Sequence, residues 1–496
     1  MRNRFPWRQR LATALTTLLC VLGTRAAMAQ SSLQPVGWDA DLRLPEAVDL
    51  NPDPHILEIN LEASVAPVQI RPGSPVEAWT YNGGVPGPLI RLHVGDRLIV
   101  HFSNKLPKPT TVHWHGLRIP IQMDGVPEHS QPEVQPGGSF TYDFVVPDAG
   151  LFWYHPHVMS AAQVGFGLYG ALLVEDPSER VGVADELVLV LSDIAITDKG
   201  KLEPADSGGS VAMAFGREGD DVLVNGRTLP RLKVRSGAPQ RWRIVNAAKS
   251  RYFQLSLPDH TFTQIGGDGG LLEYPVTRDY VLIATGERVD VIVTPRGKPG
   301  VDLILTSPLH NRGYGSIEYR VQPDLLTLHV ADLPPHAGSP LPALKRAVEP
   351  LSTAGATSVN IELTLAQLVD LSFEYGINGV PFAANRPVLA KLQETQIWTV
   401  TNKTKWSHPF HLHGFFFQVL DERGAPVHPL AWKDTVNVPR EETVRFVVRF
   451  DDRAGSWMYH CHILDHADGG LMGMVNVGVP EHAGHSAAGA PTAPVR

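Results

Sequence analysis

Cysteine is almost absent from this chain, with only Cys20 and Cys461 among 496 residues. A small scaffold held together by disulfides is therefore excluded. Cys20 lies inside an expected export signal over 1–29, in which basic residues precede an apolar stretch and a small-residue site that ends at Ala29. Once that segment is removed, Cys461 is the only thiol. A lone thiol in an exported chain requires pairing between chains, burial or a metal.

Long apolar runs and an excess of basic residues are missing as well. The apolar stretch in 1–29 is too short to cross a bilayer and no later uncharged run reaches that length, so we expect no membrane anchor. Removing 1–29 takes away five of the 43 basic residues and none of the 51 acidic ones, so the formal charge moves from −8 to −13. That charge disfavours a nucleic-acid partner. We expect an exported monomer, periplasmic or extracellular.

Turn-forming residues, by contrast, are plentiful, with 45 glycines and 42 prolines. Between them lie short runs rich in Val, Ile, Thr and Phe, such as DRLIVHFSN and ETVRFVVRF, which is typical of all-β sandwiches. An Asn-Gly pair begins each third of the chain, at Asn82, Asn225 and Asn378. An asparagine ends a strand-like run 21 to 24 residues after each pair: Asn104, Asn246 and Asn402. This repeat predicts three copies of one sandwich.

The composition also suggests where these copies begin and end. We expect domains over 45–177, 178–335 and 350–480, with a proline-rich linker between the second and third. The segment 481–496 is small and polar, so we expect a disordered tail there.

Histidine is concentrated in four short motifs. They are His113-Trp114-His115, His155-Pro156-His157, His408-Pro409-Phe410-His411-Leu412-His413, and His460-Cys461-His462 followed by His466. In a β-strand, residues i and i+2 project from the same face, so each His-x-His pair offers two imidazoles to one point. Four such pairs supply eight nitrogen ligands. Imidazole suits copper, zinc, iron and nickel, so the pairs alone name no metal.

Cys461 narrows the choice of metal. On a strand it faces away from His460 and His462, towards a second site where His408 and His466 are available. Two imidazoles and a thiolate form the trigonal set of a blue-copper electron-transfer centre. One strand then serves two sites, and the covalent route from the Cys461 sulfur through the backbone to either neighbouring imidazole spans on the order of 10 Å, within reach of electron transfer. A structural zinc site closes with four ligands, often several cysteines, and does not fit a set with one thiol.

At these motifs the chain resembles the multicopper oxidases, in the three-domain branch of laccases and bilirubin oxidases. The likeness runs from YNGGVPGPLIRLHVGDRLIVHFSN to GLMGMVNV. It implies three cupredoxin-like Greek-key β-sandwich domains and four copper ions: one type 1, one type 2 and two type 3. By the family pattern, the type 2 ligands are His113 and His411, the type 3 ligands are His115, His155, His157, His413, His460 and His462, and the type 1 ligands are His408, Cys461 and His466. The middle domain carries no such motif. The resemblance therefore implies that it acts as a spacer and forms a wall of the substrate site.

The axial position of the type 1 site departs from many relatives. They have methionine ten residues after the cysteine, where this chain has Leu471. Without an axial sulfur ligand, the copper is expected to have a raised potential. A shift of one residue would instead bring in Met472.

Three aspartates are candidates for moving protons. Asp124 matches an acid that relatives place beside the O2-reducing coppers, although it also reads as a turn residue before Gly125. Where some relatives have a glutamate proton donor, this chain has Ala467, and Asp468 is the candidate substitute. Asp434 matches a region where some relatives place an acid near an exposed edge of a type 1 histidine. There it would accept a proton from a phenol or aromatic amine, unless it is a solvated acid at a strand end.

The resemblance implies a laccase-like oxidase that takes single electrons from a small aromatic or metal-ion reductant, at the exposed edge of a type 1 histidine, and passes them to O2. Bilirubin oxidase and metallo-oxidase remain alternatives. Relatives that oxidise cuprous ion carry a methionine-rich insertion, whereas the eight methionines here are scattered. A copper-free envelope scaffold would have lost the ligands, which this chain keeps. A copper nitrite reductase lacks the paired His-x-His motifs.

Overall fold

The computed structural model describes residues 42–480, except for 72, 74, 180, 184, 314–322, 337–345 and 369–371. The expected export signal, the expected tail and part of the expected linker lie outside the described residues.

Strands between residues 56 and 175 form the first block, a sandwich of two four-stranded sheets. One sheet has the order β2-β1-β4-β6 and the other the order β3-β8-β7-β5. The strands are β1 (Ile56–Val68), β2 (Val76–Tyr81), β3 (Ile90–His93), β4 (Arg97–Asn104), β5 (His113–His115), β6 (Ser139–Val145), β7 (Gly150–His155) and β8 (Gly170–Glu175). The short helices η1 (Ile121–Met123) and α2 (Ser160–Gly165) lie in the connections.

The middle block, between residues 185 and 330, contains a seven-stranded sheet of order β11-β10-β9-β13-β18-β15-β16, with the smaller sheets β12-β20-β19 and β14-β17. Its strands are β9 (Asp185–Ile194), β10 (Asp221–Val224), β11 (Arg227–Thr228), β12 (Arg231–Val234), β13 (Gln240–Asn246), β14 (Phe253–Leu255), β15 (Phe262–Gly267), β16 (Gly270–Arg278), β17 (Val281–Ile283), β18 (Arg288–Val293), β19 (Asp302–Thr306) and β20 (Asp324–Val330). Helix α3 (Gly209–Phe215) joins β9 to β10.

The last block, between residues 357 and 477, is a sandwich of two five-stranded sheets, β22-β21-β24-β28-β26 and β23-β30-β29-β25-β27. Its strands are β21 (Thr357–Gln367), β22 (Phe373–Ile377), β23 (Val388–Ala390), β24 (Thr395–Asn402), β25 (His408–Leu412), β26 (Phe417–Leu420), β27 (Thr435–Val438), β28 (Thr443–Arg449), β29 (Gly455–Cys461) and β30 (Met472–Val477). The helices are η2 (Phe382–Ala384) and α4 (Leu464–Asp468). None of the described helices is long and apolar enough to cross a membrane.

The three blocks repeat one plan. Each contains a parallel strand pair in an otherwise mostly antiparallel sheet: β1 with β4, β9 with β13, and β21 with β24. In each Asn-Gly pair both residues have positive φ, as a type I′ turn requires. The side-chain oxygen of each of these asparagines accepts a backbone N–H at 2.7 Å, from Glu62, Val190 and Glu362 respectively. The predicted all-β fold of three cupredoxin-like sandwiches is confirmed.

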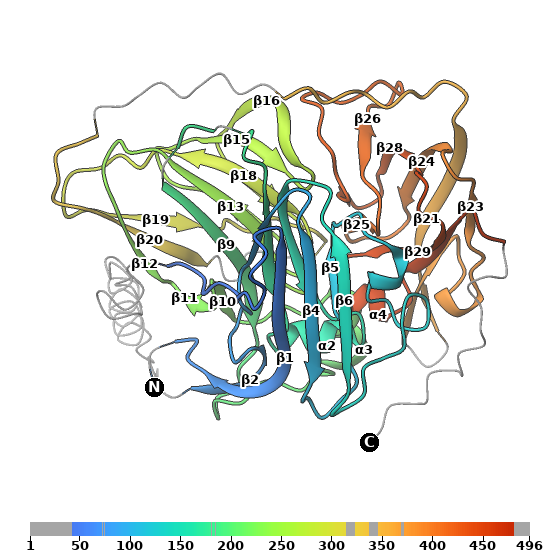
Figure 1. Cartoon of the computed structure of the whole chain (residues 1–496), viewed down its shortest axis with the longest axis horizontal. Helices are drawn as coiled ribbons and strands as arrows, with labels where there is room; N and C mark the ends of the chain where they lie inside the picture. The colour runs from blue at the N-terminus through green and yellow to red at the C-terminus, as the bar shows by residue number, and fades with distance from the viewer. Residues whose placement is uncertain are drawn as a thin grey trace, which may run out of the picture.

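Each block has its own buried apolar core, and a further apolar cluster joins the blocks. That cluster includes Trp153 from the first block, Val190 from the middle block and Leu464 from the last. In Figure 1 the first block (blue to teal) lies between the middle block (green to yellow) and the last block (orange to red), and β5 faces β25 and α4. The first and last blocks therefore meet at the strands that carry histidines.

The asparagines that end the predicted strand-like runs are buried. The side chain of each forms hydrogen bonds with backbone groups of the loop that follows it. The Asn246 amide donates to the carbonyls of Arg251 (2.8 Å) and Ile283 (3.0 Å), and its oxygen accepts from the Ala248 N–H (3.0 Å). Asn104 and Asn402 make the same kind of contacts in the other two blocks. The repeat seen in the sequence therefore corresponds to a buried asparagine side chain that holds a loop in place in each block.

Replacing Asn246 by alanine should lower the unfolding temperature measured by calorimetry. The substitution leaves three buried backbone groups without a partner, at a cost of about 1–3 kcal/mol for each group. Asn60→Ala is the matched control, because Asn60 is exposed on β1. Equal unfolding temperatures for the two variants would contradict this stabilising role of Asn246.

Candidate metal centres

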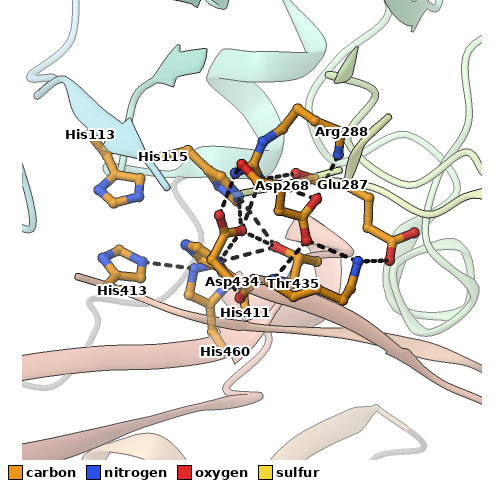
Figure 2. Close-up of polar contacts among 12 residues, drawn as sticks. His113, His115, Asp268, Glu287, Arg288, His411, His413, Asp434, Thr435 and His460 are labelled. Carbon is orange, nitrogen blue, oxygen red and sulfur yellow. Dashed lines mark hydrogen bonds and ion pairs between the residues drawn. The ribbon is translucent and has the colours of Figure 1, made fainter. Parts of the chain in front are cut away.

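Two strand pairs bring the paired histidines together where the first and last blocks meet. Pairing of β5 with β7 sets His113 opposite His155, and pairing of β25 with β29 sets His411 opposite His460. Three of the groups that their ligand atoms form consist of histidines alone, each with all its atoms within 4.8 Å of one another. These groups are His113, His411 and His413; His113, His115 and His155; and His157, His413 and His460. The structure therefore gathers side chains that are hundreds of residues apart in the sequence (Figure 2).

One nitrogen of several rings is held by a fixed acceptor. The pairs are His113 Nδ1 to the Asp124 carbonyl (2.7 Å), His155 Nδ1 to the Pro156 carbonyl (3.0 Å), His411 Nδ1 to the Asp434 carbonyl (2.9 Å) and His115 Nε2 to the Asp434 carboxylate (3.1 Å). The other nitrogen of each of these four rings is buried and has no hydrogen-bond partner among the described residues. A neutral imidazole that donates from one nitrogen offers a lone pair at the other, as metal-bound histidines do. The orphaned nitrogens fit metal ions between the two blocks.

The site also keeps its imidazoles neutral. Burial lowers the pKa of nine histidines in and near the groups, and for most of them neighbouring histidines lower it further. The pKa of His408 and that of His413 each fall to about 3. Neutral imidazole is the form that binds metals, so the environment favours cations over protons.

Asp124 lies against two of these rings, with its side chain 1% exposed. It accepts a hydrogen bond from His413 Nδ1 at 2.8 Å, and its carboxylate lies 3.3 Å from His113 Nδ1. Burial alone would raise the pKa of Asp124, but His413 and His113 overcome that effect and hold the pKa below its usual range. Asp124 is therefore more than a turn residue, because its charge faces the histidine groups.

The position expected for Asp434 is wrong. This residue is not at the edge of a type 1 histidine and is not solvated, because its side chain is 1% exposed and contacts His115 and His411 instead. Burial would raise the pKa of Asp434, but the Arg288 guanidinium holds it well below its usual range. Figure 2 shows Asp434 between these rings and Arg288. Asp434 cannot take a proton directly from a substrate at the surface.

Cys461 and two histidines form a separate group on the other face of β29. The Cys461 sulfur lies 3.3 Å from His408 Nδ1 and 3.7 Å from His466 Nδ1, and these two nitrogens are 3.1 Å apart. All three side chains are buried. Burial raises the pKa of the Cys461 thiol, so the thiolate needs a bound cation to form. The alternation expected of the strand is present, with Cys461 turned away from its two histidine neighbours.

Strand register separates Leu471 from Met472. The Cys461 N–H donates to the Leu471 carbonyl at 3.0 Å, and Leu471 belongs to the same apolar core as Cys461. Met472 pairs with His460 and packs in a different apolar cluster, with Met458. Paired residues in an antiparallel ladder project from the same face, so Met472 lies on the His460 face. The register thus supports Leu471 as the neighbour of Cys461.

The expected exposed edge of a type 1 histidine is absent, because His408 and His466 are both 0% exposed. Tyr375 stacks on the His466 ring with a centroid distance of 4.5 Å, and its hydroxyl donates to the carbonyl of Ala214 on α3 at 2.6 Å. Sequence patterns could not show this cover, because α3 belongs to the middle block and Tyr375 to β22. An electron donor must approach this group through its protein cover.

Asp468 lies at the end of α4, beside the helix α2. Its carboxylate accepts the backbone N–H groups of Ser160 (3.3 Å) and Ala161 (2.9 Å) at the start of α2. Among the described residues, none of the histidines donates a hydrogen bond to it. Its suggested part in proton supply stays a prediction.

Two residues of the middle block at the site were missed by the sequence motifs. Arg288 contacts Asp434, and the Thr285 hydroxyl donates to the His462 carbonyl at 2.7 Å. Neither residue stands in a histidine motif, and a buried arginine is indistinguishable in sequence from a surface one. The middle block is therefore more than the spacer expected from the sequence.

Comparison with known proteins agrees with this geometry. Models of the multicopper oxidase family match residues 63–179, 185–313 and 355–481. The chain is 33% identical to the multicopper oxidase MmcO of Mycobacterium tuberculosis, over 82% of this chain and 84% of that protein. It is 29% identical to a laccase of Bacillus subtilis, over 82% and 91% respectively.

Solved structures extend the likeness. A multicopper oxidase from Campylobacter jejuni, described as a metallo-oxidase, is 28% identical with a TM-score of 0.79, covering 88% of this chain and 94% of that one. One from Pseudomonas thermotolerans is 33% identical with a TM-score of 0.73, covering 85% and 99%. The chain belongs to the multicopper oxidases. It is a three-domain, copper-dependent oxidoreductase with O2 as electron acceptor.

The copper-free protein should lose stability as the pH falls below about 6.5, the pKa of an unperturbed histidine. Burial keeps the folded-state pKa lower, at about 3 for His408 and His413, so between these pH values the unfolded chain binds more protons. The free energy of unfolding then falls by about 1.4 kcal/mol per pH unit for each such histidine. Denaturant unfolding of the apo-protein from pH 7 down to pH 5 measures this. The copper-loaded protein is the control, and an apo-protein equally stable across that range would contradict the expectation.

Proposed function

We propose that this protein is an exported, laccase-like oxidase that takes single electrons from small phenols or aromatic amines and reduces O2 to water. The observation that carries the proposal is the strand β29, on which Cys461 faces one group of ligands while its neighbours His460 and His462 face the other. A one-electron site and a multi-metal site are thereby joined through a few covalent bonds. A protein that only bound metal ions would not need a covalent link between the two groups.

The ligand sets divide by the face of the strands. His408, Cys461 and His466 would hold the type 1 copper, and His113 and His411 the type 2 copper. The type 3 pair would be held by the remaining six histidines: His115, His155, His157, His413, His460 and His462. When bound, the type 1 copper would accept one electron at a time, and the four coppers together would store the four electrons that O2 reduction requires.

Asp124 is the best-placed group for handling protons. Its Oδ2 holds the N–H of His413, which leaves the opposite ring nitrogen for metal. Its Oδ1 is buried and lies 3.3 Å from His113 Nδ1, so both carboxylate oxygens face the proposed copper ligands, where protons are needed. Reduction of O2 to water at these coppers would consume protons there.

The electron donor would bind in a cavity of about 470 Å³ beside α3. Phe215 and Arg217 line the cavity, and the Arg217 backbone N–H donates to Asp465 at 2.6 Å, one residue before His466. The volume suits a small organic molecule. Electrons would cross the cover of His466 rather than pass at an exposed ring edge.

A metal-ion donor is the second candidate. The cavity is lined by three acidic residues, Glu203, Glu218 and Asp220, and by three basic ones, Arg217, Lys249 and Arg251, so its charge is balanced and the candidate rests on the family likeness. The similar structure from Campylobacter jejuni is described as a metallo-oxidase. A comparison of donors separates the two candidates.

The protein loaded with copper should contain four coppers per chain, absorb strongly in the blue-copper band and show a near-ultraviolet type 3 shoulder. It should consume O2 with a simple phenol, and faster than with cuprous ion or bilirubin. Metal analysis, a visible spectrum and an oxygen electrode give these values. One copper without the shoulder would overturn the oxidase assignment. Faster turnover of cuprous ion would show that a metal ion, and not a phenol, is the preferred electron donor.

Replacing Asp124 by asparagine should slow O2 reduction by about 10²-fold or more, because the amide cannot accept a proton as the carboxylate does. Reduction of the type 1 site should stay intact, since the contacts of Asp124 are with the other histidine groups. Anaerobic bleaching of the blue band and O2 consumption measure the two steps separately. Asp148→Asn is the control, because Asp148 pairs with Arg118 away from the histidines. Unchanged O2 consumption in the Asp124 variant would count against the role.

A further inference from the structure

Arg288 is buried at the start of β18 in the middle block, with its side chain 1% exposed. All five of its guanidinium N–H groups are used. The acceptors are the carbonyls of Leu151 (3.0 Å), Gly286 (2.9 Å) and Asp268 (3.1 Å), the Asp434 Oδ1 (2.8 Å) and the Asp434 Oδ2. A buried charge is tolerated when its hydrogen bonds are complete and it is paired. Arg288 is therefore a buried cation in which every guanidinium N–H group has an acceptor.

The acceptors of Arg288 come from all three blocks. Leu151 belongs to the first block, Asp268 and Gly286 to the middle block, and Asp434 to the last. The two contacts to Asp434 form a bidentate fork, which fixes the plane of the carboxylate as well as its place. Lysine has three N–H groups around a single point and cannot reproduce the five contacts.

Asp434 transmits this placement to two of the proposed copper ligands. Its Oδ1 accepts the His115 Nε2–H at 3.1 Å, and its backbone carbonyl accepts the His411 Nδ1–H at 2.9 Å. These bonds leave His115 Nδ1 and His411 Nε2 as the free nitrogens. A ring nitrogen that donates its N–H to an acceptor cannot bind metal. The acceptor therefore decides which nitrogen of the imidazole is available as a ligand.

The turn before Arg288 contacts the same ring system. Gly286 has φ +86°, and a Cβ built there would lie 2.8 Å from His462 Cγ and 3.2 Å from His115 Cε1. Thr285 donates to the His462 carbonyl at 2.7 Å. The turn Thr285–Arg288 thus contacts His462 directly through Thr285, leaves no room for a side chain at Gly286, and reaches Asp434 through Arg288.

A second set of charges holds the turn itself. Asp268 accepts the Arg288 backbone N–H at 2.8 Å and lies 3.0 Å from the Lys433 Nζ. Lys433 also lies 3.2 Å from Glu287. Lys433 directly precedes Asp434, so the last block is tied to the turn at two successive residues. Figure 2 shows these groups on one side of the histidines.

We propose that the turn Thr285–Arg288 is a positioning element of the trinuclear copper site, in which Arg288 acts through Asp434 to orient His115 and His411. This inference rests on the proposed function, because it needs copper at those ligands. It gives the middle domain a part in the metal site although that domain supplies no ligand.

The test compares Arg288→Lys with Arg241→Lys in the copper-loaded full chain. Arg241 is also a buried arginine of the middle block, paired with Asp290, but it contacts no histidine in the described structure. In Arg288→Lys the affinity of the type 2 copper should fall by about 10- to 100-fold, the usual effect of removing a group that orients a ligand. Chelator titration with metal analysis measures the affinity. The electron-spin-resonance signal of the type 2 copper should weaken, while the blue absorption of the type 1 site is kept.

The outcomes distinguish a failure of the proposed function from a failure of this inference. An unsubstituted protein that binds no trinuclear copper would sink the proposed function and this inference together. Normal binding by the unsubstituted protein, with Arg288→Lys holding its type 2 copper as tightly as Arg241→Lys does, would overturn the inference alone. If Arg288→Lys yields no blue protein, Thr285→Val replaces it, because it removes one hydroxyl and keeps the shape. Faster loss of the near-ultraviolet shoulder under chelator would support the inference, and an unchanged rate would overturn it.

Discussion

The two-residue period of the β-strand is the constraint on which the rest of this molecule depends. Because side chains alternate along β29, Cys461 must face away from His460 and His462, and one strand serves two metal groups. The neighbouring strand β25 obeys the same rule and places His408 with Cys461 but His411 with His460. The three blocks, the inter-block core and the helix α4 keep these strands in register.

A second constraint comes from burying so many imidazoles in one place. Each ring must lose its water and remain neutral, and an acceptor that fixes one nitrogen of a ring leaves the other nitrogen free for metal. The backbone carbonyls of Asp124 and Asp434 supply some of these acceptors, and the carboxylates of the same residues supply more. Placing Asp434 then requires a buried arginine, and the middle block provides it.

Much of this arrangement could be predicted from the sequence. The β-fold followed from turn residues and short alternating runs, and the repeated Asn-Gly pairs marked the three blocks. The grouping of Cys461 with His466 followed from alternation together with the spacing of His466, because both are properties of a single local segment. His408, on the strand β25, was added from the family pattern. The contact between Asp124 and the histidine groups agreed with the family pattern.

The rest depended on contacts between distant segments, which no local pattern records. Asp434 was expected near the type 1 group, although its neighbour in space is Arg288, from another block. The cover of His466 by Tyr375 and α3 was missed for the same reason, since it joins β22 to a helix of the middle block. Solvent exposure of a side chain is a property of the assembled molecule, and motif spacing carries little of it.

The division of the histidines between the first and last blocks also has a consequence for biogenesis. The ribosome makes β5 and β7 early and β29 near the end, with the whole middle block between them. Half of the ligands proposed for the type 2 and type 3 coppers, and all three residues of the Cys461 group, are therefore missing until almost the whole chain has been synthesised. Metal capture at the shared boundary can follow only the docking of the last block, so a copper-loaded molecule is one whose three blocks have already assembled correctly.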